Sequence, residues 1–249
     1  MSPQRRLRRF FSSTPINRSG QEITLSEAES LHLGRILRLE KGSTCLLTDE
    51  TGREAEAVVA GFRDGRAVLT VSVLKESGYR ENTLPITVSP ALLQRSLMDD
   101  LVRKAQELGV QAFQPVETSR TIVKMTAESR SRVADRWRKI VREAAKQSGS
   151  LQPMEVFEPI AFKDALSSLR DSELGILFDP NGPESFRDCL EHLEKDKTCH
   201  LFWGPEGGFS KEEAALAQSM KCRIVNLGKS ILKADTAFLG VTASLRFFL

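Results

Sequence analysis

The sequence predicts an α/β protein of two domains, a compact β-barrel in residues 1–78 and a mostly parallel sheet flanked by helices in residues 79–249. Two patterns lead to this prediction. Residues 43–73 form short apolar runs separated by turn signals, which favours a barrel. After Pro85, short apolar runs alternate with helical stretches, which is typical of a parallel sheet. Residues 75–83 are polar and aperiodic, so we place the domain boundary there.

In the first domain we expect three strands, with turns between them, over residues 43–49, 54–60 and 66–73. A helix is expected before them over residues 26–39, because Ser26 and Glu29 have the spacing of a capping box. Its inward face would carry Leu31, Ile36 and Leu39.

In the second domain the first strand is expected at residues 86–89, followed by a helix over 92–108 that ends at Gly109. A long basic helix is expected over residues 127–147, and a final helix runs to Leu249. The remaining strands are expected at residues 111–115, 154–157, 174–178, 199–203 and 223–227.

The composition is that of a globular protein. The 249 residues are 40% hydrophobic and 28% charged, without an apolar run long enough to span a bilayer or to act as a secretory signal, so we expect a cytoplasmic chain without membrane contact. The four cysteines are far apart and without a C-x-x-C pair, which favours reduced core thiols. The three histidines lack i, i+4 spacing, so no metal site is expected.

The charge is unevenly distributed. The net charge of +3 resolves into +3 over residues 1–80, +4 over residues 81–150 and −4 over residues 151–249. Residues 1–20 contain five arginines and no acidic residue. The basic N-terminal portion and the acidic C-terminal portion suggest that the first 150 residues bind a polyanion.

The most informative motif is the loop Gly204-Pro205-Glu206-Gly207-Gly208, which follows an apolar strand. Glycines allow positive φ or a close approach to a ligand, and open α/β sheets bind ligands at the carboxyl ends of their strands. The spacing matches neither the dinucleotide fingerprint nor the phosphate-binding loop. A glycine-rich turn before a helix that Ser210 and Glu213 cap is the alternative interpretation.

Two other loops, at residues 226–237 and 178–182, also follow predicted strands. Together the three loops would form a pocket rich in backbone amides and carbonyls, which suits a neutral or zwitterionic cofactor with a purine better than a triphosphate. A nucleophilic triad is disfavoured, because the chain has no G-x-S-x-G motif and its histidines lie outside these loops.

These loops resemble those of the RsmE family of the SPOUT methyltransferases, the S-adenosylmethionine-dependent 16S rRNA uracil-1498 N3-methyltransferases. The similarity rests on the glycine loop, on Leu227-Gly228-x-x-Ile231-Leu232-x-x-Asp235-Thr236-Ala237, and on motifs along nearly the whole chain. The latter are Arg8-Arg9-Phe10-Phe11, His32-x-x-Arg35-Ile36-Leu37-Arg38, Lys104-Ala105-x-Glu107-Leu108-Gly109-Val110, Trp137-x-Lys139-Ile140 and Gln147-Ser148-Gly149.

The resemblance implies a PUA-like N-terminal barrel, a SPOUT-type domain with a C-terminal trefoil knot, and a homodimer that acts on 16S rRNA within the small ribosomal subunit. It places S-adenosyl-L-methionine in the knot loops. The residues expected around the cofactor are Phe178, Asp179, Gly204, Pro205, Glu206, Gly207, Leu227, Gly228, Ile231 and Leu232.

Methylation of uracil N3 requires a group that accepts the imide proton. A carboxylate could do this directly or through water, and the candidates are Asp235 and then Glu206. The alternatives are a helix N-cap for Asp235 and a loop carboxylate for Glu206. RNA would contact basic side chains, namely Arg5, Arg6, Arg8, Arg9, Arg35, Arg38, Arg120, Lys124 and Lys233.

The chain departs from the family pattern at three positions. Lys233 and Asp235 stand where the family usually has arginine and glutamate, and Ser150 stands where an arginine usually follows the Gln-Ser-Gly motif. Lysine lacks the two-pronged donor of arginine. Two alternatives therefore stay open: a catalytically weakened RNA-binding or ribosome-assembly protein, and a SPOUT methyltransferase acting on another RNA.

Overall fold

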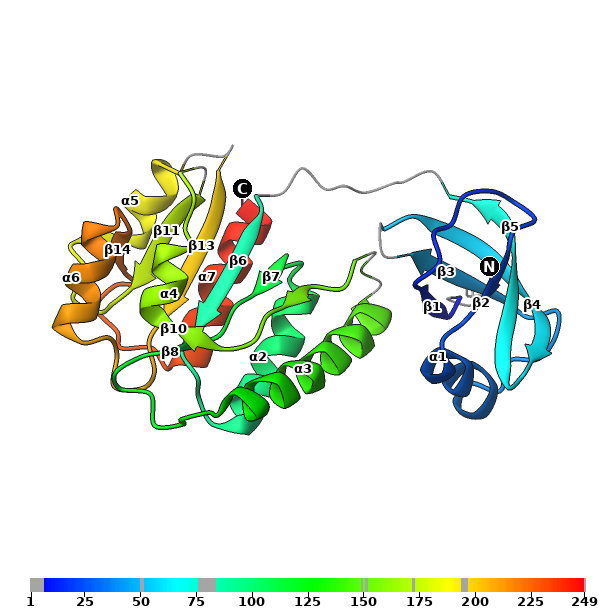
Figure 1. The fold of residues 1–249 in the computed structure, drawn as a ribbon. Coiled ribbons are helices and arrows are strands. Elements are labelled where there is room, and N and C mark those ends of the chain that lie inside the picture. Colours follow the sequence, from blue (N-terminus) through cyan, green and yellow to red (C-terminus); the bar gives the residue numbers. More distant parts are fainter. Residues whose placement is uncertain are drawn as a thin grey trace. The chain divides into compact units, whose positions relative to one another are not determined.

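The structure is a computed structural model that describes residues 7–49, 52–75, 84–148, 150, 152–171, 173–193 and 197–248 (Figure 1). The chain divides into two compact units. The first comprises Met1–Glu81 and Ala145–Gln152, and the second comprises Asn82–Ala144 and Pro153–Leu249. The expected boundary between residues 78 and 79 lies outside the described residues.

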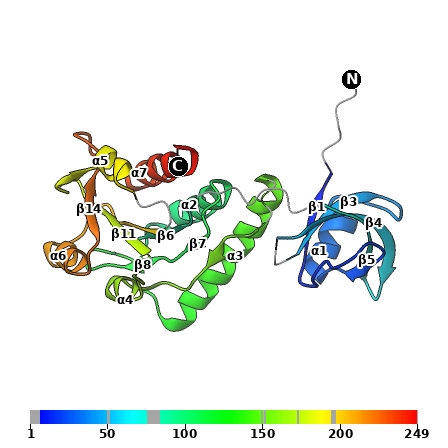
Figure 2. The same ribbon diagram turned by 90° about the horizontal axis from the view of Figure 1, so that it is seen from above.

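The first unit contains one five-stranded sheet with the order β1-β3-β4-β5-β2. All its pairs are antiparallel except β1 with β3. The sheet curves, with α1 (Glu27–Leu31) beside it (Figure 2), and Phe10, Leu47 and Leu69 are fully buried in its core. The three predicted strands are confirmed as β3, β4 and β5; the strand bounds are Arg9–Ser12, Glu22–Thr24, Thr44–Asp49, Glu54–Arg63 and Arg66–Leu74.

The helix expected over residues 26–39 is shorter than predicted. After α1 the backbone continues as a single π-helical stretch, η1 (His32–Ile36), where the N–H of Leu37 donates to the carbonyl of His32 five residues back. This wider turn rotates the side chains away from their α-helical positions. The prediction that Leu31 and Ile36 face inward is therefore wrong, since they are 48% and 64% exposed. Leu39 packs against the core as expected.

The predicted capping box is half formed. The Ser26 hydroxyl accepts the N–H of Glu29 at 3.3 Å. The Glu29 carboxylate instead accepts the N–H of Phe11 and pairs with Lys146 at 2.6 Å. Glu29 therefore links the first helix to strand β1 and to the segment 145–152 of the same unit.

The second unit contains a seven-stranded sheet with the order β12-β14-β11-β13-β6-β7-β9. Each pair of neighbouring strands in it is parallel, which confirms the predicted parallel sheet. The short strands β8 (Val116–Glu117) and β10 (Ile160–Ala161) pair separately. The bounds of the main strands are Ile86–Pro90 for β6, Ala112–Phe113 for β7, Glu155–Val156 for β9, Glu173–Phe178 for β11, Glu184–Ser185 for β12, Thr198–Trp203 for β13 and Arg223–Asn226 for β14.

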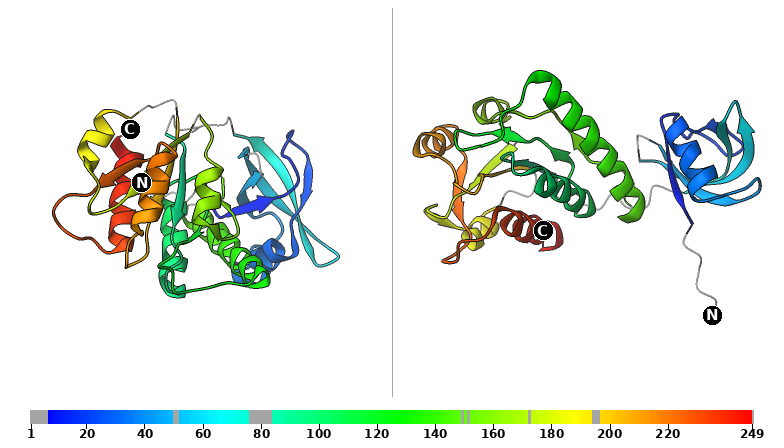
Figure 3. Two further views of the ribbon diagram at one scale, coloured as in Figure 1. Left: turned by 60° about the vertical axis from the view of Figure 1, so that its left-hand side comes forward. Right: turned by 90° about the horizontal axis from the view of Figure 1, so that it is seen from below.

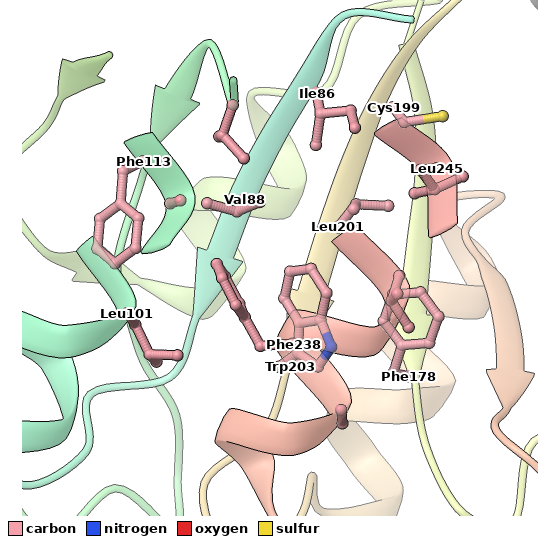
Figure 4. Packing of buried hydrophobic residues seen from close by; sticks show 14 of the residues in the cluster. Ile86, Val88, Leu101, Phe113, Phe178, Cys199, Leu201, Trp203, Phe238 and Leu245 are labelled. Carbon is pink, nitrogen blue, oxygen red and sulfur yellow. The ribbon is translucent and has the colours of Figure 1, made fainter. Parts of the chain in front are cut away.

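Helices cover both faces of this sheet (Figure 3). Alternate residues of a strand point to opposite faces, so Leu201 and Trp203 of β13 enter the core shared with α2, α3, α5 and α7, while Phe202 enters the core shared with α4 and α6. Figure 4 shows the first of these cores. The helices span Arg95–Glu107 for α2, Ala127–Ser148 for α3, Phe162–Ser167 for α4, Phe186–Glu191 for α5, Lys211–Ser219 for α6 and Ala234–Phe248 for α7.

One buried polar pair joins two central strands. The hydroxyl of Ser89 on β6 lies 2.7 Å from Nε2 of His200 on β13, and both residues are at most 5% exposed. Burial lowers the pKa of His200 from 6.5 to about 4, so its imidazole is neutral at pH 7. The pair satisfies two polar groups that would otherwise be buried without partners.

The four cysteines are buried free thiols, as expected. Burial raises their pKa values to about 11 for Cys189 and Cys222 and to about 12 for Cys45 and Cys199. None of the described helices is both long and apolar enough to cross a bilayer. The described part of the chain also holds no group of three or more histidine, cysteine, aspartate or glutamate residues placed to bind a metal ion.

Candidate active site

A cavity of about 660 Å³ opens at the carboxyl ends of β14, β11 and β13, which are adjacent in the sheet. Three loops form most of its wall, one after each strand. They contribute residues Phe178 to Asn181, Trp203 to Phe209, and most of the segment from Leu227 to Ala237. The position agrees with the rule that open α/β sheets bind ligands outside the carboxyl ends of their strands.

The glycine loop after β13 is tightly folded. A Cβ at Gly204 would lie 3.0 Å from the carbonyl carbon of Gly208, so a side chain there would push the backbone of the loop outward by a few tenths of an ångström. Gly208 has a φ of +68°, and its N–H donates to the carbonyl of Pro205 at 2.8 Å. At the far end the predicted capping box is confirmed, because Ser210 and Glu213 bond reciprocally at the start of α6.

The loop after β11 is held against β14. The Asp179 N–H donates to the carbonyl of Val225, and the side-chain amide of Asn226 donates to the carbonyl of Gly182 at 2.8 Å. A Cβ at Gly182 would lie 2.8 Å from the backbone of Val225, so only glycine allows this approach. The Asp179 carboxylate also accepts the N–H of Asn181, which orders the turn at the cavity wall.

The loop after β14 supplies both apolar and charged groups. Ile231 is 86% exposed and Leu232 is 42% exposed although both line the cavity. Lys233 is exposed, and Asp235 is the second residue of α7. The Asp235 carboxylate accepts the N–H of Thr236 at 2.8 Å. Because Asp235 already lies inside the first turn of the helix, it does not have the position of an N-cap.

The floor of the cavity is aromatic. The Trp203 indole stacks on Phe178 with ring centroids 5.1 Å apart, and Phe238 of α7 packs on its other side at 4.9 Å (Figure 4). The indole Nε1 of Trp203 is buried and has no hydrogen-bond partner among the described residues. An unpartnered donor in a mostly apolar cavity of this volume fits a nucleoside cofactor with a planar base.

The turn before α3 reaches the glycine loop. The Arg120 guanidinium donates to the carbonyl of Gly207 at 2.5 Å, and the Ser119 N–H donates to the Glu213 carboxylate at 2.7 Å. The turn itself is closed by Thr121, whose hydroxyl accepts the N–H of Thr118. These bonds fix Arg120 at the rim of the cavity.

The structure brings every residue expected around the cofactor to this one cavity, together with Asp235, Lys233 and Arg120. Their roles toward a ligand stay predictions. Sequence reasoning missed Leu93, which precedes α2, and Leu97, which lies in its first turn; both enter the wall. Their helical spacing is indistinguishable from that of core residues, so no signal in the sequence would have separated them.

The basic residues expected to contact RNA have different environments. Arg5 and Arg6 lie outside the described residues. Arg9 is engaged inside the first unit, since its guanidinium pairs with Glu54 at 2.7 Å and donates to the carbonyl of Ser150. The remaining side chains are exposed, namely Arg8, Arg35, Arg38, Arg120, Lys124 and Lys233.

Comparison with known proteins identifies the family. A family model described as the RNA methyltransferase domain matches residues 80–246. The chain is 30% identical over 235 residues to ribosomal RNA small subunit methyltransferase E of Aquifex aeolicus, covering 93% of this chain and 96% of the relative. The chain belongs to the ribosomal RNA small subunit methyltransferase E family.

Other members of the methyltransferase E family agree with this. The Synechocystis sp. protein is 33% identical over 217 residues, which are 86% of this chain and 69% of the relative. The Neisseria gonorrhoeae member, solved with bound S-adenosyl methionine, is 27% identical and covers 97% of this chain and 98% of its own, with a TM-score of 0.86. The predicted family and the α/β methyltransferase fold are therefore confirmed.

Proposed function

We propose that this chain is an S-adenosylmethionine-dependent methyltransferase that methylates N3 of a uridine of the U1498 class in 16S rRNA. The observation that carries the proposal is the cavity of about 660 Å³ at the strand ends, in a chain of the methyltransferase E family. Its walls combine an aromatic floor, aliphatic side chains and three carboxylates. These are the groups that a nucleoside cofactor and a uracil require.

S-Adenosylmethionine would be held by the three loops. Leu227, Ile231 and Leu232 offer aliphatic surface to an adenine, and the glycine loop offers backbone groups at close range. Asp179 also lines the cavity, and its carboxylate can accept hydrogen bonds from hydroxyl or ammonium groups. When bound, the cofactor supplies an electrophilic methyl group.

The protein must remove the N3 proton of the uracil. Asp235 is our first candidate for the acceptor, because it lines the cavity from the first turn of α7 beside Lys233. The carboxylate takes the proton directly or through one water, the N3 electron pair forms the new N–C bond, and the methyl group leaves its sulfur. Glu206, on the glycine loop, is the second candidate. The loops supply the rest of the catalysis by positioning the two reactants.

We further propose that the first unit is a PUA-like barrel that binds the RNA, and that the loops around the cavity belong to a trefoil knot. Support for RNA binding comes from the exposed Arg8, Arg35 and Arg38. The knot is supported by the return of α7 into the core beside the glycine loop, where Phe238 packs on Trp203. We also propose a homodimer that acts in the cytoplasm on the small ribosomal subunit.

Methyl transfer to defined substrates tests the function. The purified chain is incubated with labelled S-adenosylmethionine and either a 16S rRNA transcript or small subunits from a strain in which the corresponding gene is deleted. We expect N3-methyluridine at a single position, mapped by mass spectrometry. Cofactor and RNA binding without any transfer would instead favour an RNA-binding protein whose Lys233 and Asp235 do not support catalysis.

A further inference from the structure

A cavity of about 530 Å³ shares a wall with the candidate active site. Leu93 lines both cavities, and Val123 and Met125 of the second come from the same turn as Arg120 of the first. Both cavities lie within the second unit. The lining of the second includes Arg95, Met98, Arg132, Arg136 and Trp137.

The floor of this cavity is apolar and held in place. Met98 and Trp137 are 1% exposed, and the indole N–H of Trp137 donates to the Asp99 carboxylate at 3.1 Å. The guanidinium of Arg136 pairs with the same carboxylate. Trp137 and Arg136 are therefore fixed by one aspartate, which leaves a preformed surface.

Two other arginines on the rim are available to a ligand. Arg95 is exposed and makes no hydrogen bond or ion pair with any described residue. Arg132 faces Glu128 at 3.4 Å, but the two side chains are 71% and 80% exposed. Such a surface pair contributes little, so the Arg132 guanidinium can exchange its partner at small cost.

We propose that this cavity binds the nucleotide of the substrate RNA that neighbours the target uridine. Its base lies against the apolar floor, and Arg95 and Arg132 contact the flanking phosphates. Two observations favour RNA as the occupant: the guanidinium groups complement phosphate charge, and the shared Leu93 wall places the cavity next to the site where the target base must enter. The proposal rests on the proposed function.

The test compares two pairs of substitutions on the same two helices. Arg95→Ala with Arg132→Ala removes the rim charges, whereas the control, Arg103→Ala with Arg142→Ala, removes the same charge from positions outside both cavities. The probe is a labelled fragment of 16S rRNA that contains the target uridine, and binding is measured by fluorescence anisotropy at several salt concentrations.

We expect the rim pair to weaken RNA binding at least tenfold and to reduce the salt slope by about 1.4, because each lost phosphate contact on a single strand removes about 0.7. The control pair should stay within threefold of the wild type. Affinity for S-adenosylmethionine, measured by calorimetry, should be unchanged in both. Equal losses in the two pairs would overturn the proposal.

A third variant tests the cavity itself without altering charge. Met125→Trp fills the space, and we expect weaker RNA binding with an unchanged salt slope and unchanged cofactor affinity. A change in sedimentation behaviour instead, with RNA binding intact, would show that a second copy of the chain covers the cavity.

The proposed function and the nucleotide site can fail separately. If the wild type binds the fragment and the variants show these losses, but the wild type transfers no methyl group, the proposed function fails while the nucleotide site stands. Absence of RNA binding by the wild type overturns both.

Discussion

Arg120 donates a hydrogen bond from its guanidinium to the carbonyl oxygen of Gly207 at 2.5 Å. The two residues are far apart in the sequence, one in the turn before α3 and the other in the glycine loop after β13. Through this bond Arg120 supports the glycine loop that forms part of the cavity wall. Under the proposed roles, in which Arg120 contacts RNA and the cavity binds S-adenosylmethionine, one guanidinium group would connect the two binding events.

Arg120→Ala should weaken S-adenosylmethionine binding about five- to fifteenfold, because a charge-assisted hydrogen bond at an exposed site contributes about 1 to 1.5 kcal/mol. Isothermal titration calorimetry measures the change. Arg103→Ala, which lines neither cavity, is the control and should bind normally. Cofactor affinity that is the same in both variants would show that Arg120 does not order the glycine loop.

Gly204→Ala and Gly207→Ala form a matched pair within one loop. The new Cβ at position 204 would meet the backbone of Gly208 at 3.0 Å, whereas at position 207 it would meet only the side chain of Arg120 at 3.4 Å. We expect Gly204→Ala to lose at least tenfold in cofactor affinity and Gly207→Ala to stay within threefold. Thermal unfolding reports whether the first variant remains folded. The reverse order of affinities would contradict the described loop geometry.

Asp235→Ala should lower kcat for methyl transfer about 100-fold or more, since general-base catalysis typically contributes about 10² to 10⁴ in rate. Cofactor affinity should change less than threefold, so the loss appears in turnover. Glu206→Gln on the glycine loop serves as the comparison and should retain most of the activity. Near-normal turnover by Asp235→Ala would exclude it as the proton acceptor and leave Glu206 as the candidate.

The buried His200 makes stability depend on pH. Its pKa is about 4 in the folded chain and 6.5 when unfolded, so the unfolded chain binds the extra proton between these values. This contribution to stability is complete above pH 6.5 and is lost as the pH falls toward 4. The loss over this range is about 3 kcal/mol.

Urea unfolding at pH 7 and pH 4 measures this loss. The double variant Ser89→Ala with His200→Phe removes both partners of the buried pair, and its stability should depend less on pH by the same amount. Ser89→Ala alone leaves a buried imidazole nitrogen without its partner and should cost about 1 to 3 kcal/mol at pH 7. A double variant with the wild-type pH dependence would assign the effect to other groups.

Much of the fold could be predicted from local patterns. The alternation of apolar runs and helical stretches identified β11, β13 and β14 and their loops, because buried parallel strands have a composition that distinguishes them. The cavity followed, since glycines and strand ends mark it directly. The inward face of the first helix could not be predicted, because the shift to π-helical bonding at His32 leaves no signal in hydrophobic spacing.

The contributions of distant segments were also out of reach. Arg9 has the sequence environment of an RNA-contacting arginine, yet its pairing with Glu54 depends on the register of β1 against β3 and β4. Leu93 lines both cavities because the chain turns after β6, and its apolar character alone indicates a core residue. Tertiary geometry decides such roles.

The last residues of α3 determine whether the two units can be encoded by separate, continuous gene segments. Because Ala145–Gln152 belongs to the first unit, the chain passes between the units three times, and no single cut separates them. A polypeptide ending at residue 81 would lack Lys146, the ion-pair partner of Glu29. Recombination that grafts this N-terminal unit onto another enzyme therefore has to carry the eight-residue segment with it, or evolve a replacement.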